Sequence, residues 1–113
     1  MIGNNEFAIH MESSDEAATV RCSGRLTYTT APQLRSEVKR LLPQTRVVTI
    51  DFTDVTLVDS MGLGTIAGLY ASARAAGCEL KVVNLSPRVR ELFSVTRILS
   101  LFEPCGEANV RMP

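Results

Sequence analysis

An apolar run followed by a short polar helix start constrains this chain more than any other feature. Residues 47–52 read Val-Val-Thr-Ile-Asp-Phe, and after a short connector residues 59–64 read Asp-Ser-Met-Gly-Leu-Gly. The first stretch is nearly all apolar or β-branched, which predicts a central strand covered on both faces. The second opens a helical pattern that places Leu63, Ile66 and Ala73 on one face. Together they predict a strand, a turn and an amphipathic helix.

Ser60 falls at the start of this predicted helix, beside Asp59. Free backbone N–H groups and the positive end of the helix dipole stabilise an anion there. Asp and Ser are also ordinary N-caps, worth about 1 kcal/mol, and capping alone is the commoner role. Gly62 and Gly64 each cost up to about 1 kcal/mol in the first turn. They indicate that side chains are kept away from Ser60, so that another backbone or another protein can come close.

Hydrophobic periodicity orders the chain as β-β-α-β-α-β-α-β. Alternating strands and helices require crossover connections and mainly parallel pairing. We therefore expect an α/β fold, with a mixed sheet of four or five strands and helices mainly on one face. The predicted strands are residues 6–12, 18–23 (ended by Gly24), 46–52, 80–85 and 99–103; the predicted helices start at Thr29 or Thr30, at Ser60 (ending near Ala76 and Gly77) and at Ser86-Pro87; the predicted core includes Val47, Val48, Ile50, Val82, Val83, Leu34, Val38, Leu63, Ile66, Leu92 and Phe93.

Length and composition indicate one domain over residues 1–113, with a core of about residues 6–103. Residues 104–113 are expected to form a tail with little regular structure, or one short helical turn. Twelve basic and twelve acidic residues cancel, which argues against general nucleic-acid binding. No apolar run reaches the roughly 18 residues that span a bilayer, and the N-terminus lacks signal-peptide features, so we expect a cytoplasmic protein without membrane insertion.

Enzyme chemistry finds little support in the sequence. A serine nucleophile needs a base, and the only histidine, His10, is predicted on the outer side of the first strand. Neither a G-x-S-x-G motif nor a nucleotide-binding P-loop occurs. Asp51, Asp54 and Asp59 lack metal-site spacing, and the three cysteines are far apart. We therefore expect no catalytic residues, no metal and no cofactor.

The chain resembles the STAS domains of bacterial anti-sigma factor antagonists. The resemblance is carried by the Asp-Ser-Met-Gly-Leu-Gly helix start, the apolar run before it, residues 86–93 and residues 23–26 with Thr30. It implies a binding module whose serine after the Asp, here Ser60, is phosphorylated by a partner kinase that is also the anti-sigma factor. The unphosphorylated form would bind that partner and free the sigma factor. A phosphatase would reset the cycle.

Two departures from the family pattern concern the binding surface. The usual G-E-L-D loop reads Gly-Arg-Leu-Thr at residues 24–27, and Met61 replaces the usual Ser or Thr. The loss of acid at Thr27 leaves open an alternative role as a STAS subunit of a lipid-transport or stress-sensing assembly. We expect a monomer or weak dimer. The predicted partner-binding residues are Thr27, Tyr28, Thr29, Asp59, Met61, Gly62, Ser86 and Pro87.

Overall fold

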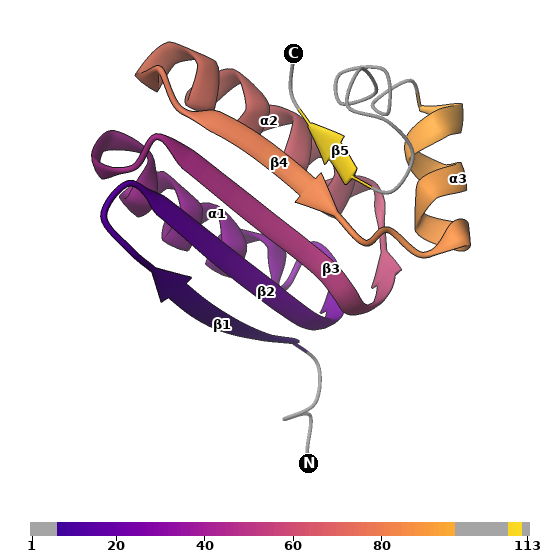
Figure 1. Cartoon of the computed structure of the whole chain (residues 1–113). Coiled ribbons are helices and arrows are strands. Elements are labelled where there is room, and N and C mark those ends of the chain that lie inside the picture. The colour runs from indigo at the N-terminus through magenta and orange to yellow at the C-terminus, as the bar shows by residue number, and fades with distance from the viewer. Residues whose placement is uncertain (1–6, 97–108, 112–113) are drawn as a thin grey trace.

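A computed structural model describes residues 7–96 and 109–111 of the chain. The sheet has five strands in the order β1-β2-β3-β4-β5 (Figure 1). The pairs β2–β3 and β3–β4 are parallel, whereas β1–β2 and β4–β5 are antiparallel. The predicted element order is therefore confirmed. The elements are β1 (Phe7–Ser13), β2 (Ala17–Leu26), α1 (Ala31–Leu41), the short 3-10 helix η1 (Leu42–Gln44), β3 (Val47–Val58), α2 (Ser60–Ala76), β4 (Glu79–Val83), α3 (Pro87–Val95) and β5 (Asn109–Arg111).

Helices α1 and α2 lie side by side on one face of the sheet, and α3 lies beyond the end of β4 (Figure 1). Within the described residues, no helix covers the opposite face, which is turned toward the viewer. Burial alternates along β3 accordingly: Val48 and Ile50 are buried, whereas Val47 and Asp51 are only half-buried. The prediction that this strand is covered on both faces is therefore wrong. Val83 is half-buried for the same reason.

The core lies between the sheet and the helices. Phe52 on β3 and Phe93 on α3 meet edge to face, with ring centroids 6.2 Å apart, an arrangement that adds to the gain from burial. Leu92 is only partly buried, in contrast to the prediction, because it packs against the core while also lining an open groove. The other helix residues predicted in the core are buried, namely Leu34, Val38, Leu63, Ile66 and Phe93.

Both β2 and β3 continue past their predicted ends. They pair as far as Leu26 and Val58, across irregularities in register near Ser23 and Gly24. Gly24 has a φ of 98°, a conformation that glycine adopts without strain, so it lies within the strand and does not end it. The pairing of β3 with β4 stops earlier, at Asp51. The end of β3 therefore extends beyond β4 with β2 as its neighbour.

The helix ends follow the predicted signals in most places. Gly77 ends α2 in the left-handed conformation, with a φ of 72°. Ser86 caps α3 by accepting a hydrogen bond from the backbone of Val89. The predicted strand at residues 99–103 lies outside the described residues. The tail contributes β5, where little regular structure was expected, because pairing with an edge of β4 stabilises three residues that have weak periodicity of their own.

Candidate phosphorylation and partner-binding site

The carboxylate of Asp59 holds together two segments that lie far apart in the sequence. One oxygen accepts a hydrogen bond from the backbone N–H of Gly62 at 2.9 Å, which caps α2. The other accepts from the backbone N–H of Tyr28 at 3.0 Å. The backbone N–H of Asp59 in turn donates to the carbonyl of Leu26. The start of α2 is thus fastened to the loop between β2 and α1.

Ser60 is the first residue of α2 and is exposed. Its hydroxyl makes no hydrogen bond to any other described residue. Asp59 provides the cap, so a capping role for Ser60 is wrong. The hydroxyl is therefore exposed at a helix N-terminus, where negative charge is favoured.

Hydrogen bonds among threonines shape the loop that Asp59 holds. The buried Thr30 hydroxyl accepts from the backbone N–H of Thr27 at 2.8 Å and donates to the carbonyl of Arg25 at 2.7 Å. The hydroxyls of Thr27 and Thr29 lie 3.1 Å apart. Tyr28, between them, is 68% exposed. The loop is therefore internally bonded and projects an aromatic side chain next to Asp59.

The two glycines of the first turn have different surroundings. A Cβ on Gly62 would lie 2.5 Å from the carbonyl oxygen of Leu26 and 3.0 Å from a methyl group of Val58. Gly62 is buried and allows α2 to pack closely against the end of β2, so it does not face a partner as predicted. A Cβ on Gly64 would meet nothing within 4 Å. Only Gly64 leaves open space for an approaching protein.

Met61 extends this surface toward α1. Its side chain is 58% exposed and borders a cleft of about 320 Å³ between α1 and α2. Gly64 and Gly68 line the cleft from α2, and Arg35 and Lys39 line it from α1. The surface beside Ser60 thus combines an exposed apolar side chain with two basic ones.

Ser86 and Pro87 are not joined to this group by any hydrogen bond within the described residues. Ser86 caps α3, which begins at the end of β4. The structure therefore brings Thr27, Tyr28, Thr29, Asp59, Ser60 and Met61 together, and it places the Ser86–Pro87 turn at the start of the neighbouring helix α3.

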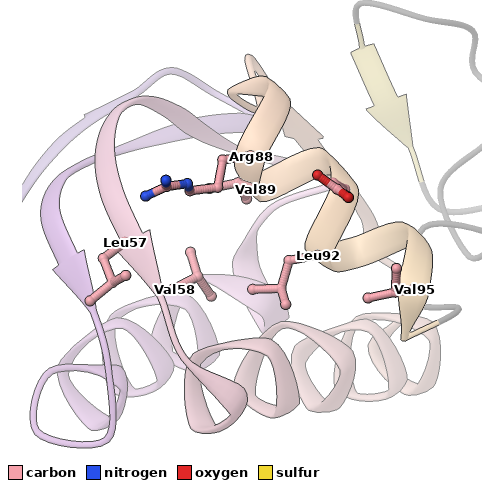
Figure 2. Close-up of a pocket in the computed structure, with 7 residues that line it drawn as sticks. Leu57, Val58, Arg88, Val89, Leu92 and Val95 are labelled. Atoms are coloured by element: carbon pink, nitrogen blue, oxygen red, sulfur yellow. The ribbon is translucent and has the colours of Figure 1, made fainter.

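Sequence reasoning missed a groove between the end of β3 and α3. It has a volume of about 350 Å³ and is lined mainly by aliphatic side chains (Figure 2). The apolar pair Leu57-Val58, beyond the predicted end of the strand at residue 52, was the signal in the sequence. The lining residues are Leu57, Val58, Arg88, Val89, Glu91, Leu92 and Val95.

Among the ionisable groups outside this site, Asp51 is stabilised as an anion. Partial burial opposes its ionisation, but hydrogen bonds from Thr53 and from Asn84 hold the pKa of its carboxyl below the usual range. The described residues contain no group of three or more acidic, histidine or cysteine side chains able to hold a metal ion. Within the same residues, no helix is both long and apolar enough to cross a membrane.

Comparison with known families agrees with this geometry. The STAS domain family matches residues 8–110. The chain belongs to the STAS family. The match spans the hairpin, the Asp59–Ser60 junction and all three helices, so the site described above lies wholly inside the STAS domain.

Curated relatives of this STAS domain carry one recurring name. The anti-sigma-B factor antagonist of Bacillus subtilis is 28% identical over 95 residues, covering 84% of this chain and 87% of that protein. The Listeria monocytogenes anti-sigma-B factor antagonist is 32% identical over 82 residues, covering 72% of each chain. These relatives match the domain over most of their own length.

Solved structures share its fold. The unphosphorylated form of the anti-sigma factor antagonist SpoIIAA superposes with a TM-score of 0.72 and 22% identity, over 80% of this chain and 82% of that one. Its phosphorylated form, from Bacillus, superposes with a TM-score of 0.67 and 22% identity, over 79% and 83%. At this level of identity the likeness concerns the fold.

Proposed function

We propose that this STAS domain is an anti-sigma factor antagonist whose binding is switched off by phosphate on Ser60. The observation that carries the proposal is the Ser60 hydroxyl, exposed and without a hydrogen bond to the described residues, between the exposed Tyr28 and Met61. The recurring name of the relatives supports it. The partner is an anti-sigma factor that also acts as the serine kinase.

The proposed switch is electrostatic. A phosphate adds about −1.5 to −2 charge, so with Asp59 the local charge reaches about −3. The N-terminus of α2 accommodates that charge, so the fold itself is retained. A partner that buries this surface without matching cations binds the phosphorylated form much more weakly, because like charges oppose each other. The domain itself performs no catalysis in this scheme.

The wider cycle follows from the same site. The kinase transfers a phosphoryl group from ATP to Ser60 while its own base takes the hydroxyl proton, and a phosphatase removes the group by hydrolysis. This cycle operates in the cytoplasm, where ATP and sigma factors are found.

A second candidate function is a STAS subunit of a lipid-transport or stress-sensing assembly without a sigma factor. Thr27 and Arg25 favour it, since the loop held by Asp59, residues 24–30, contains no acidic side chain. A partner that recognises this loop would then differ from the partners that recognise the acidic loops usual in the family. Co-purification with a permease instead of a kinase would distinguish this role from the first.

Phosphosite mapping tests the leading proposal. The protein is incubated with ATP and candidate serine kinases of the histidine-kinase-like ATPase type, and binding is titrated before and after modification. We expect phosphate on Ser60 alone and at least about tenfold weaker binding afterwards. Ser60→Ala should bind normally without being modified, whereas the exposed Ser36→Ala serves as a control that is modified normally. Stoichiometric phosphorylation of Ser60→Ala, or undiminished binding of the phosphorylated form, would contradict the proposal.

A further inference from the structure

The end of β3 has one strand neighbour instead of two. β4 pairs with β3 only from Val47 to Asp51, whereas β2 pairs with it as far as Val58. Among the described residues, no backbone hydrogen bond joins the stretch from Asp54 to Val58 to helix α3. Within the part of the chain that the structure describes, the edge of this stretch that faces away from β2 therefore has no backbone partner, as at the edge of a sheet.

The groove described above, here called the β3–α3 groove, lies along this free edge. Figure 2 shows Leu57 and Val58 on the strand side, with Leu92 and Val95 on the helix side. Leu57 is 41% exposed and Val95 is 70% exposed, and both line the same groove, where grouped apolar side chains mark an interaction site. A volume of about 350 Å³ is at the small end of the range for ligand sites, so it suits a few side chains better than a large cofactor.

Arg88 and Glu91 give the groove one charge of each sign. Figure 2 shows the Arg88 side chain reaching from α3 toward β3, above Val58. It is exposed and makes no ion pair with any described residue. An acidic side chain on an occupant would complement this guanidinium, which favours carboxylates because of its planar donor geometry.

We propose that the β3–α3 groove binds an extended segment of the anti-sigma factor, added as a strand to the free edge of β3. Alternate side chains of the segment pack against Leu57, Leu92 and Val95, and an acidic one faces Arg88. A helix would fill the apolar space but leave the edge unpaired, so an extended segment fits better. The identity of this partner rests on the proposed function. The groove begins at Val58, immediately before Asp59 and Ser60, so a partner bound at Ser60 is also close to the groove.

The position of the exposed apolar residues supports a single continuous surface. The described residues contain four large exposed apolar side chains: Tyr28, Leu57, Met61 and Val95. The backbone of Tyr28 is bonded to Asp59, Met61 follows Ser60 in the chain, and the other two line the groove. The groove includes Val58, one residue before Asp59, so a partner that covers Ser60 also comes close to the groove.

The first experiment tests the groove without any sigma factor. A displayed library of heptapeptides is selected on the wild-type protein and on Arg88→Glu. We expect enriched peptides with alternating apolar residues and an acid on the wild type, and a shift to basic residues on Arg88→Glu. Val95→Lys should reduce binding of the enriched peptides at least about tenfold, whereas Thr19→Lys on the open face of the sheet should not. No enrichment, or equal binding by Val95→Lys, would overturn the proposal.

The second experiment uses the kinase that modifies Ser60, with amide hydrogen exchange as the readout. Of the amides between Val55 and Val58, those that point away from β2 should exchange quickly in the free protein and slowly in the complex, because strand addition forms hydrogen bonds there. Fast exchange in both states would overturn strand addition, and slow exchange in the free protein would show that the chain already covers its own edge.

If Val95→Lys is phosphorylated and binds like the wild type, the groove is wrong as the binding site while the proposed function stands. If no kinase modifies Ser60 although peptides bind, the anti-sigma factor is wrong as the occupant.

Discussion

Gly62 and Gly64 lie in the same turn of α2, but they differ in what surrounds them. Close packing at Gly62 leaves no room for a Cβ beside the carbonyl of Leu26, whereas Gly64 faces open space. The sequence predicted one role for both, since each lowers helix propensity by a similar amount. The difference depends on the end of β2, which tertiary pairing brings to α2, and no local pattern contains that information.

Alanine substitution should separate the two glycines. Gly62→Ala should destabilise the domain by about 1–3 kcal/mol, because the added methyl group forces Leu26 and the helix apart. Gly64→Ala should stabilise it by up to about 1 kcal/mol, because alanine is the better helix former and meets no neighbour. Urea denaturation with a shared m value measures both. Equal stability of Gly62→Ala and the wild type would contradict the close packing.

At the scale of elements, the N-terminus of α2 depends on Asp59 more than on Ser60. Asp59→Ala should cost about 0.5–2 kcal/mol, because it removes the acceptor for the backbone N–H of Gly62 and frees the loop at Tyr28. Ser60→Ala should change stability by no more than about 0.5 kcal/mol, since its hydroxyl bonds no described residue. Chemical denaturation of both variants checks this order. A larger loss for Ser60→Ala would assign the cap to the serine.

The elements themselves were largely predictable, because their signals are local. Apolar periodicity predicted the three helices, and Gly77 and Ser86 marked two of their ends. The lengths of β2 and β3 were not predictable, since both continue across irregular pairing at Gly24. The open face of the sheet was missed because Val47 and Thr49 have strand-forming side chains whether or not a helix covers them.

The candidate site was predictable in part for a similar reason. Asp59 and Ser60 stand in a recognisable order, so the sequence alone indicated a helix start, but it did not decide which of the two residues caps the helix. That Asp59 also holds Tyr28 is a long-range contact. The β3–α3 groove depends on where β4 stops pairing, which the pattern of residues 80–85 did not reveal.

At the scale of the whole molecule, burial of Cys22 couples stability to pH. Burial, with a smaller effect from the charge of Asp51, raises the pKa of its thiol to about 12. In the unfolded chain the thiol ionises near pH 9, so between these values the unfolded state binds fewer protons than the folded state. Stability that is fully present below pH 9 should therefore be lost as pH rises, by up to about 1.4 kcal/mol per pH unit.

Comparison with Cys22→Ala measures this contribution. The substitution lowers overall stability through the small cavity it leaves, so the quantity to compare is the slope of unfolding free energy against pH. Urea denaturation between pH 8 and 10.5 should give a shallower decline above pH 9 for the variant than for the wild type. Parallel declines would show that other groups, including the Cys78 thiol whose pKa is also raised, account for the effect.

The double use of the Asp59 carboxylate has a consequence for the entropy of recognition. Tyr28 and Met61 belong to segments separated by the whole of α1 and β3, yet one side chain fixes the loop to the helix start. A partner therefore meets a template that is already ordered, and little conformational freedom is lost when it binds. Such a template lets a small group on one hydroxyl change affinity directly, without first having to reorganise the chain that presents it.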